Sequence, residues 1–391
     1  MINVGVFFGS RSAEHDVSII TGLQVLENLD KTKYTAFPVY ISKKGEWFVG
    51  EPLKKIDSYR PFKEDMHGIT KVILPPVPSM NGLYELPTSG LLKKTHKVCD
   101  LDCAILATHG MHGEDGTIQG LLELADIPYS SCSLVGSSVG MDKIIMKGVF
   151  KSMGLPVLDG TYCYRSAWFE NRDPIIEEAE KIGYPLFVKP ANLGSSIGIS
   201  KATDRPSFIS AMEVAVQYDR RILIEKGLDC PTEINCACVG FDGKVTPSLC
   251  EQPKSWTEFL SFEDKYTRGS GSKGMKSLSR SVPAPITDEM TELIQSYTAQ
   301  IFRMLECKGV VRVDYMIDRM TNQVYVGEIN TIPGSFAFYL FEPMGIPFAK
   351  LLDGIIDDAF KALEQKRKSS FAYASDILEK ATGGGTKGVK R

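Results

Sequence analysis

Several kinds of pattern are missing from the 391-residue chain, and each absence argues against a class of protein. No apolar run reaches the roughly 20 residues that a helix needs to cross a bilayer, so a membrane protein is not expected. Lys and Arg number 45 and Asp and Glu 48, which gives a net charge of −3 and no general attraction to nucleic acids or anionic lipids. No nucleic-acid or membrane partner is therefore expected, and any phosphate must be bound by local groups.

Paired cysteines and a secretory leader are also lacking. The nine cysteines include no CxxC pair, and no signal-peptide pattern stands at the N-terminus. We expect reduced, mostly buried thiols in a cytoplasmic protein. Cys236 and Cys238 would share one face of a strand and could hold a metal, but no second ligand pair stands at zinc spacing. Core packing is the preferred interpretation of this pair.

Two familiar nucleotide-binding motifs are absent as well. Neither the P-loop pattern GxxxxGK[ST] nor a GxGxxG after the first apolar run occurs. A P-loop NTPase and a dinucleotide-binding dehydrogenase are both disfavoured. Because single cores stop growing near about 250–300 residues, the length predicts two or three domains.

The first part of the chain has the pattern of alternating strands and helices. Residues 2–9 (INVGVFFG) and 101–107 (LDCAILA) are short apolar runs typical of buried parallel strands. Each precedes a polar loop and a helix with apolar residues on one face, and Asp16 is expected to cap the first helix. Ligands bind open α/β sheets at such loops. Residues 50–97 are Pro-rich and are expected to be irregular, with short strands.

Beyond residue 136 the pattern favours antiparallel strands with flanking helices. The segment 136–138 (GSS) is expected to cap a helix that carries Lys143 and Lys147 one turn apart. Residues 186–202 and 221–240 each predict two strands, so this half is expected to be α+β. The final twenty or so residues are basic and Gly-rich, which predicts a frayed tail.

A Gly/Ser-rich turn at residues 192–198 (NLGSSIG) could hold phosphate oxygens. Its successive backbone N–H groups and two hydroxyls suit an anion, although most hairpin turns bind nothing. Lys189 ends the apolar strand before this turn, where a charge is costly unless it meets an anion. Glu225 and Lys226 end another apolar strand, and on their own they would be interpreted as a solvated strand end.

Two later runs, GVVRVDYMID (309–318) and QVYVGEINTIPG (323–334), predict a hairpin of buried strands. Alternation places Arg312 with Asp314 on one face of the first strand and Glu328 with Asn330 on one face of the second. Two carboxylates and an amide make an oxygen-only site, which suits Mg²⁺ shared with phosphates better than zinc. The alternative is a polar face open to solvent, and the choice depends on whether this face meets a cleft.

Taken in order, seven segments resemble the D-alanine–D-alanine ligases of the ATP-grasp superfamily. They are EHDVS (14–18), HGMHGEDGTIQGLLE (109–123), GSSVGMDK (136–143), KPANLGSSIG (189–198), DKY (264–266), GVVRVDYM (309–316) and EINTIPG (328–334). The resemblance covers almost the whole chain apart from residues 50–97 and the tail. It implies a mixed α/β and α+β ATP-grasp fold. The implied parts are an N-terminal open α/β domain (1–135), a central lid domain (136–227), a C-terminal α+β catalytic domain (228–365) and a flexible tail (366–391).

The resemblance also implies an activity. In such ligases ATP phosphorylates the carboxylate of a first D-alanine, and the amine of a second amino acid attacks the acylphosphate. We therefore expect a cytoplasmic ATP-dependent ligase that uses Mg²⁺ or Mn²⁺, acts on small amino acids, makes a D-alanyl-D-alanine-type dipeptide for peptidoglycan, and forms a homodimer. Such chemistry relies on positioning and charge stabilisation.

Roles for individual residues follow from the same resemblance. Glu14 would take the ammonium of the first amino acid in a hydrogen-bonded set with Ser195 and Tyr266, and Arg312 would stabilise the oxyanion. The implied nucleotide residues are Lys143, Lys189 and Ser196 at the phosphates, Glu225 and Lys226 at the adenine, Glu233 at the ribose, and Lys265 at the transferring phosphoryl group. The implied second-substrate residues are His109, Gly334 and Tyr339, and the implied metal ligands are Asp314, Glu328 and Asn330.

Other functions would leave different residues in place. An ATP-binding protein without turnover would lose a metal or oxyanion residue, whereas Arg312 and the three implied metal ligands are all present. A carboxylase-type ATP-grasp enzyme would have no reason to keep Glu14, Ser195 and Tyr266 together. A dipeptide-forming ligase is preferred to both.

One stretch departs from the family pattern. Family members commonly follow the Pro-Gly with a hydroxyl-rich stretch whose Ser holds the acceptor carboxylate, whereas this chain has SFAFYLFE (335–342) with Tyr339 at that position. Either the tyrosine hydroxyl replaces the serine and D-alanine remains the acceptor, or the pocket is reshaped for another D- or L-amino acid or a hydroxy acid. In the second case Phe336 and Phe338 would be pocket walls. Residues 268–281 are long and basic, and could form a mobile lid.

Overall fold

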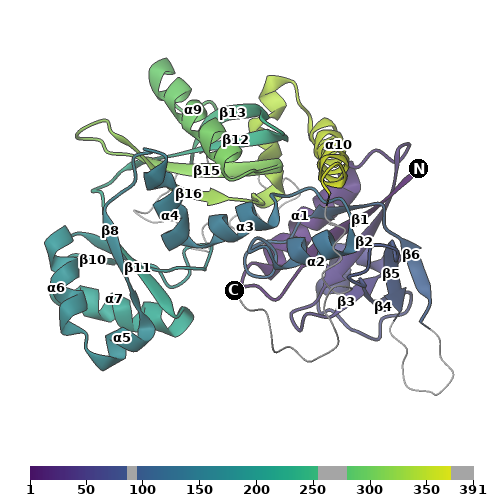
Figure 1. Cartoon of the computed structure of the whole chain (residues 1–391), viewed down its shortest axis with the longest axis horizontal. Coiled ribbons are helices and arrows are strands. Elements are labelled where there is room, and N and C mark those ends of the chain that lie inside the picture. The colour runs from purple at the N-terminus through teal and green to yellow at the C-terminus, as the bar shows by residue number, and fades with distance from the viewer. Residues whose placement is uncertain (86–94, 254–279, 371–391) are drawn as a thin grey trace, which may run out of the picture.

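The computed structural model describes residues 1–85, 95–253 and 280–370. These residues form three β-sheets, each accompanied by helices (Figure 1). Lys265 and Tyr266, most of the predicted lid segment 268–281 and residues 371–391 of the predicted tail lie outside the described residues. Within the described part, no helix is both long and apolar enough to cross a membrane.

The N-terminal sheet is built around the first predicted strand. β1 lies between β2 and β7 and runs parallel to both, and its apolar run is buried because helices and loops cover the sheet. Short antiparallel strands extend the sheet beyond β2, so the region near residues 50–97 contributes short strands as predicted. The elements are β1 (Ile2–Gly9), α1 (His15–Asn28), β2 (Tyr34–Ile41), β3 (Trp47–Val49), η1 (Glu51–Lys54), η2 (Ile56–Tyr59), β4 (Thr70–Ile73), β5 (Gly82–Glu85), β6 (Lys97–Asp100), β7 (Cys103–Leu106) and α2 (Thr117–Ala125).

A four-stranded antiparallel sheet with the order β10-β9-β11-β8 follows in the chain. Its apolar core is formed with α5, α6 and α7, which supply buried residues such as Trp168, Ile176 and Phe208. The elements are α3 (Leu134–Met141), α4 (Lys143–Ser152), β8 (Gly160–Tyr164), α5 (Arg165–Glu170), α6 (Asp173–Ile182), β9 (Leu186–Pro190), β10 (Ser200–Ala202), α7 (Arg205–Tyr218) and β11 (Arg221–Lys226).

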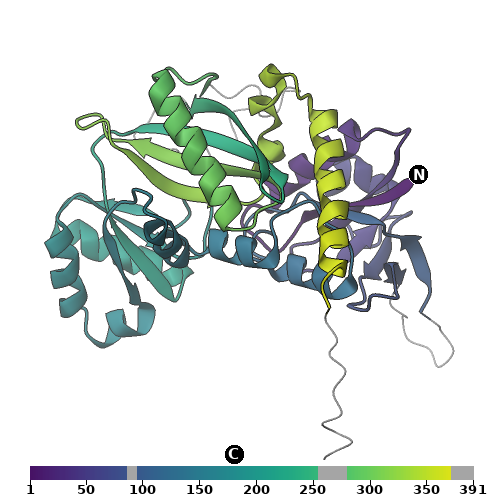
Figure 2. The same ribbon diagram turned by 45° about the horizontal axis from the view of Figure 1, so that its top comes forward.

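The third sheet has five antiparallel strands in the order β14-β13-β12-β15-β16. Helix α9 packs on β12 and β13, and α10 stands between this sheet and the N-terminal sheet (Figure 2). The elements are β12 (Thr232–Phe241), β13 (Lys244–Pro253), β14 (Arg280–Ser281), α9 (Asp288–Met304), β15 (Gly309–Ile317), β16 (Val324–Asn330), η4 (Gly334–Leu340), η5 (Glu342–Met344) and α10 (Phe348–Arg367). The predicted change from α/β to α+β organisation is confirmed.

One apolar cluster joins the first and third sheets. It contains residues of β1, β2 and β7 together with η4, α10 and the strand residues Ala237 and Val310. Cys236 and Cys238 lie fully buried in a second cluster, so their interpretation as core residues is confirmed. The first and third sheets are therefore held together by a shared apolar core.

Two predicted helix caps are wrong. Glu14, not Asp16, occupies the N-cap of α1, and Asp16 lies exposed in the first turn. The segment 136–138 lies inside α3, which Ser133 caps, while the lysine-bearing helix α4 is capped by Asp142 through the N–H groups of Ile144 and Ile145. Aspartate at an N-cap satisfies backbone N–H groups that the helix itself leaves free, whereas Gly136 offers no side chain for this purpose.

Candidate active site

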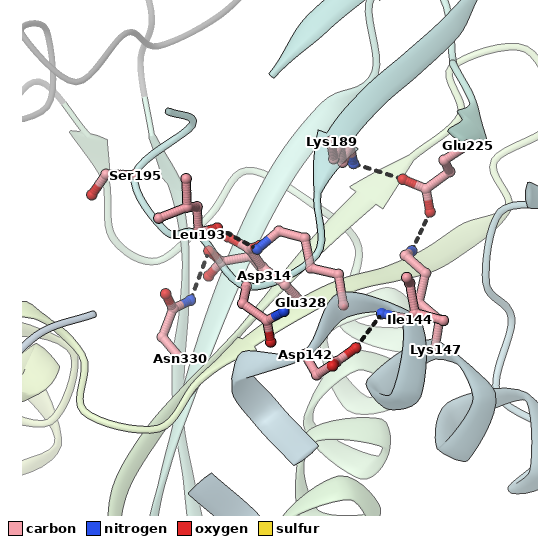
Figure 3. A network of polar contacts seen from close by, with 12 residues as sticks. Asp142, Ile144, Lys147, Lys189, Leu193, Ser195, Glu225, Asp314, Glu328 and Asn330 are labelled. Carbon is pink, nitrogen blue, oxygen red and sulfur yellow. Dashed lines mark hydrogen bonds and ion pairs between the residues drawn. The ribbon is translucent and has the colours of Figure 1, made fainter. Parts of the chain in front are cut away.

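The predicted hairpin brings its polar residues together on one face of the third sheet. Arg312 pairs in register with Asn330, and Asp314 pairs with Glu328. Arg312 donates to both oxygens of Asp314 at 2.6 and 2.8 Å. Asn330 Nδ2 donates to Asp314 Oδ2 at 3.0 Å (Figure 3). The four side chains are only partly buried, so this face is neither part of the core nor fully open to solvent.

The chemistry of this donor set fits a hard divalent cation. Among the described residues no group of three or more His, Cys, Asp or Glu side chains could hold a metal. The hairpin instead offers two carboxylates and the amide oxygen of Asn330, which its Nδ2 contact with Asp314 leaves facing away from that carboxylate. Mg²⁺ prefers oxygen ligands and commonly shares them with substrate phosphates. Asp314, Glu328 and Asn330 therefore fit the metal assignment if phosphate oxygens complete the shell.

A cavity of about 300 Å³ lies beside this hairpin, between the second and third sheets. Four predicted nucleotide residues line it: Lys189, Glu225, Lys226 and Glu233. Its apolar lining includes Leu158, Phe187, Ile199, Leu228 and Met316. Apolar walls with a few polar groups are typical of small-molecule and cofactor pockets.

Glu225 is the most deeply buried charge of the cavity. Its exposed fraction is 1%, and it lies between Lys189, at 2.6 Å from Oε2, and Lys147, which contacts Oε1. Burial alone would raise the pKa of the Glu225 carboxyl, but the two ammonium groups outweigh burial and hold this pKa below its usual value. No role was assigned to Lys147 from the sequence, although its spacing of one turn from Lys143 placed both lysines on the same helix face.

The Gly/Ser-rich loop, residues 192–198, connects all three parts of the site. Ser195 Oγ donates to Glu14 Oε1 across to the N-terminal sheet. Lys143 donates to the Leu193 carbonyl at 2.8 Å and lies 3.3 Å from Glu328 Oε2. Ser195 and Ser196 have φ of 53° and 61°, and such left-handed residues turn successive N–H groups toward one side, as in anion-binding loops.

His109 joins helix α1 of the N-terminal part to the segment that follows β16. Its Nδ1 donates to the Ile332 carbonyl at 2.9 Å, and its Nε2 accepts from Thr21 Oγ1 at 2.9 Å. Burial lowers the pKa of His109 to about 4, so the imidazole is neutral at pH 7. Glu114, which was not predicted, holds the same segment by accepting from the N–H of Ile332 at 2.9 Å.

Tyr339, which stands where the family has the acceptor-binding serine, has its hydroxyl bonded to another side chain. The phenol is buried, and its hydroxyl donates to Glu251 Oε1 at 2.8 Å. Gly334 opens the tight turn before it, in which Ser335, Phe336 and Ala337 all have positive φ. Phe336 and Phe338, the pocket walls of the reshaped-pocket alternative, both pack toward Phe348 of α10, with Phe338 stacked on it at 4.6 Å. Glu251 and Arg280 were not identified from the sequence, because their partners come from other elements of the fold.

Known proteins match the chain over nearly its whole length. The family model described as D-ala D-ala ligase N-terminus matches residues 3–132, and the D-ala D-ala ligase C-terminus model matches residues 149–357. The D-alanine–D-alanine ligase of Thermosipho melanesiensis is 37% identical over 368 residues, which are 94% of this chain and 96% of the relative. That of Ruminiclostridium cellulolyticum is 35% identical, over 93% of this chain and 97% of the relative.

Solved structures give the same result. The VanG D-Ala:D-Ser ligase from Enterococcus faecalis has a TM-score of 0.78 and 26% identity, with 92% of this chain and 99% of that chain covered. The D-alanine–D-alanine ligase from Bacillus anthracis has a TM-score of 0.66 and 28% identity, with 94% and 100% covered. The chain therefore belongs to the D-alanine–D-alanine ligase family and has its ATP-grasp fold.

Proposed function

We propose that the protein is an ATP- and Mg²⁺-dependent cytoplasmic ligase that forms an acylphosphate of D-alanine and joins it to a second amino acid, giving a D-alanyl-D-alanine-type dipeptide for peptidoglycan. The observation that carries the proposal is the 192–198 loop. Through Ser195 and Lys143 it brings Glu14 from the N-terminal sheet within one network with the hairpin residue Glu328. An ammonium site, a phosphate-binding loop and a metal site thus adjoin one another.

The first step is phosphoryl transfer to the donor amino acid. Glu14 binds the donor ammonium and leaves its carboxylate directed toward the loop, where Lys143, Lys189 and the loop N–H groups hold the ATP phosphates. A donor carboxylate oxygen attacks the γ-phosphorus, the bond to the β-phosphate oxygen breaks, and ADP leaves. Bound Mg²⁺, held by Asp314, Glu328 and Asn330, would supply neutralisation of phosphate charge. Positioning accounts for most of the catalysis in such transfers.

The second step forms the peptide bond. The neutral amine of the acceptor attacks the acylphosphate carbon, and the resulting oxyanion is stabilised by Arg312. The carbonyl re-forms as phosphate leaves, and the amine passes its proton to the departing phosphate. Loss of one oxyanion donor typically lowers the rate by about 10²–10³-fold. Two hydrogen bonds from Arg312 to Asp314 support this role, because they already hold the guanidinium in one orientation.

The nucleotide site and the domain boundaries are part of the proposal. Glu225 and Lys226 would lie at the adenine and Glu233 at the ribose, which the 300 Å³ cavity supports because all three line it. The three sheets support domains at 1–135, 136–227 and 228–365. A homodimer and the use of Mn²⁺ in place of Mg²⁺ are proposed from the family alone.

Two acceptors are compatible with the site: D-alanine, or a different amino acid or hydroxy acid. Tyr339 gives its hydroxyl to Glu251, and a structural neighbour is described as a D-Ala:D-Ser ligase. A ligase that prefers another D- or L-amino acid, or a hydroxy acid, is therefore the alternative. Phosphate release measured with D-alanine paired in turn with D- and L-amino acids and D-lactate separates the two.

Glu328→Ala tests the assignment of the hairpin. Phosphate release in the presence of ATP, Mg²⁺ and D-alanine should fall by at least about 10²-fold, because a cation that loses one of its oxygen ligands no longer fixes the triphosphate. The circular dichroism spectrum should be unchanged, since Glu328 is partly exposed. The control is Glu292→Ala on the exposed face of α9. Full activity of Glu328→Ala, or equal wild-type activity with excess EDTA, would exclude the metal assignment.

A further inference from the structure

A row of polar side chains crosses the third sheet and ends at Glu251, which, like its partner Arg280, has no assigned role. Cross-strand partners share a face of an antiparallel sheet. Glu328 pairs with Asp314, Asp314 with Asn235, and Asn235 with Glu251. At its β13 end the row therefore brings Glu251 to the same face as the catalytic hairpin, and there Tyr339 and Arg280 contact it.

Glu251 is a buried and fully bonded carboxylate. Its exposed fraction is 3%, and it accepts from Tyr339 Oη at 2.8 Å, from Asn235 Nδ2 at 3.2 Å and from Arg280 Nη1 at 3.1 Å. Burial and the charge of Glu251 raise the pKa of the Tyr339 phenol, so the hydroxyl stays protonated. Its O–H donates a hydrogen bond to Glu251. Tyr339 therefore has no second proton to give to a substrate carboxylate.

Arg280 is held rigidly beside the same residues. Its guanidinium lies 3.9 Å from the centre of the Tyr339 ring, and one of its nitrogens bonds Glu251. A stacked guanidinium loses little freedom on binding, and its five N–H donors allow it to meet two anions at once. Arg312, which also lies near Tyr339, already contacts Asp314 through two nitrogens.

We propose that Arg280 binds the α-carboxylate of the acceptor amino acid, with the Tyr339 ring as its platform and Glu251 as its anchor. The proposal rests on the proposed ligase function and specifies its second substrate: the acceptor must carry a free carboxylate. In this proposal Arg280, supported by the ring of Tyr339, does the work of the serine hydroxyl that the family has at position 339. Without Arg280, the charge of Glu251 would repel an incoming carboxylate.

An internal competition tests the proposal. The enzyme is given ATP, Mg²⁺ and equal concentrations of D-alanine and D-alaninamide, which differ as acceptors in the carboxylate alone, and the two dipeptide products are counted by mass spectrometry. Arg280→Ala should lower the ratio of dipeptide to dipeptide amide by about tenfold or more relative to wild type, the effect of one charge-assisted hydrogen bond. Arg280→Lys should give an intermediate ratio, because it keeps the charge without the fork.

The ratio is measured within one sample, so a variant that folds incompletely still reports its selectivity. Arg303→Ala, exposed at the end of α9, is the matched control and should keep the wild-type ratio. An unchanged ratio in both Arg280 variants overturns the proposal. So does Tyr339→Phe, which keeps the ring, if it lowers the ratio as far as Arg280→Ala does, because the hydroxyl would then be the receptor. If the wild type makes neither product, the joining of D-alanine to a second D-alanine fails, and the competition is repeated with the acceptor that the phosphate-release screen identifies and with the amide of that acceptor.

Discussion

His109 shows how one side chain can join two parts of the site by staying neutral. Its Nδ1 proton goes to the Ile332 carbonyl, so Nε2 must accept from Thr21, whose hydroxyl oxygen in turn accepts the Ser335 N–H at 3.3 Å. Protonation of His109 Nε2 would remove its acceptor for the Thr21 hydroxyl and would bury a positive charge. The chain of bonds therefore depends on the uncharged imidazole.

This arrangement predicts a loss of stability in acid. The pKa of His109 is about 4 in the folded protein against 6.5 for the free side chain, so between these values only the unfolded state takes up the proton. The resulting stability is complete above pH 6.5 and is lost as the pH falls toward 4, at about 1.4 kcal/mol per pH unit. His109→Gln should flatten this slope in urea denaturation at pH 6.5, 5.5 and 4.5. The exposed His67→Gln should leave it as in the wild type, and an equal slope in all three proteins would contradict the prediction.

At the residue level the sequence was informative wherever strand alternation decides the outcome. Arg312, Asp314, Glu328 and Asn330 were placed together because period-two patterns fix the face of each strand. Glu251, Arg280 and Lys147 were not found, because their contacts join β13, β14 and α4 to residues far away in the chain. Lys147 meets Glu225 from 78 positions away, and no local pattern encodes that distance.

At the scale of elements, the close approach of α1 to β1 depends on one glycine. A Cβ at Gly22 would lie 2.4 Å from Phe8 Cγ, and Phe8 is fully buried. Glycine lowers helix stability relative to alanine by about 1 kcal/mol, so it is kept here for space rather than for helix formation. Helix α4 contains the contrasting case, Gly148, where a Cβ would meet nothing within 4 Å.

The two glycines predict opposite effects of the same substitution. Gly22→Ala should lower the free energy of unfolding by about 1–3 kcal/mol, because the methyl group must displace the Phe8 ring. Gly148→Ala should raise it by up to about 1 kcal/mol through helix propensity alone. Calorimetry of both variants beside the wild type measures the difference. Stabilisation by Gly22→Ala would show that α1 can move away from β1 at little cost.

The elements themselves were well predicted, and their ends were not. Strands β1, β15 and β16 follow from apolar runs, and α1 and α4 from one-turn spacing. The caps failed because several polar residues compete within a few positions of each helix start. Asp142 caps α4 because it directly precedes that helix, whereas the segment 136–138 lies inside α3, which Ser133 caps. Which candidate wins depends on the path of the chain before the helix.

At the scale of the whole molecule, the site exists only where the three sheets meet. The sequence resemblance gave the fold and the family, but not how the 192–198 loop and the segment after β16 are held. Asn192 bonds Asp219 through two nitrogens at 2.8 and 3.0 Å, and the Ile332 N–H bonds Glu114. These contacts fix the loop and the hairpin end, and each joins residues from separate parts of the chain.

A substitution of Glu14 tests whether the first substrate binds at the junction of the N-terminal sheet and the 192–198 loop. It lies on the N-terminal unit, its exposed fraction is 8%, and it reaches the loop through Ser195, whereas the cavity proposed for the nucleotide lies between the other two sheets. Glu14→Gln keeps an oxygen for the Ser195 hydroxyl but removes the charge that would hold the donor ammonium. The KM for the donor amino acid should rise by about tenfold or more, as expected for a lost charge-assisted bond, while the KM for ATP changes by less than about twofold.

The matched control is Asp16→Asn, which removes a carboxylate two positions away on the same helix. Asp16 is exposed and pairs with Lys43 at 3.3 Å on the surface, so its loss should alter neither KM. Donor binding can be followed without the acceptor by trapping the acylphosphate with hydroxylamine, which separates the two amino acid sites when both accept D-alanine. If Glu14→Gln raised both KM values equally, Glu14 would act by closing the loop over the nucleotide, and the ammonium site would have to be sought elsewhere. A rise confined to the donor KM places the first substrate on the N-terminal unit, so that closure of the 192–198 loop brings donor and phosphate together.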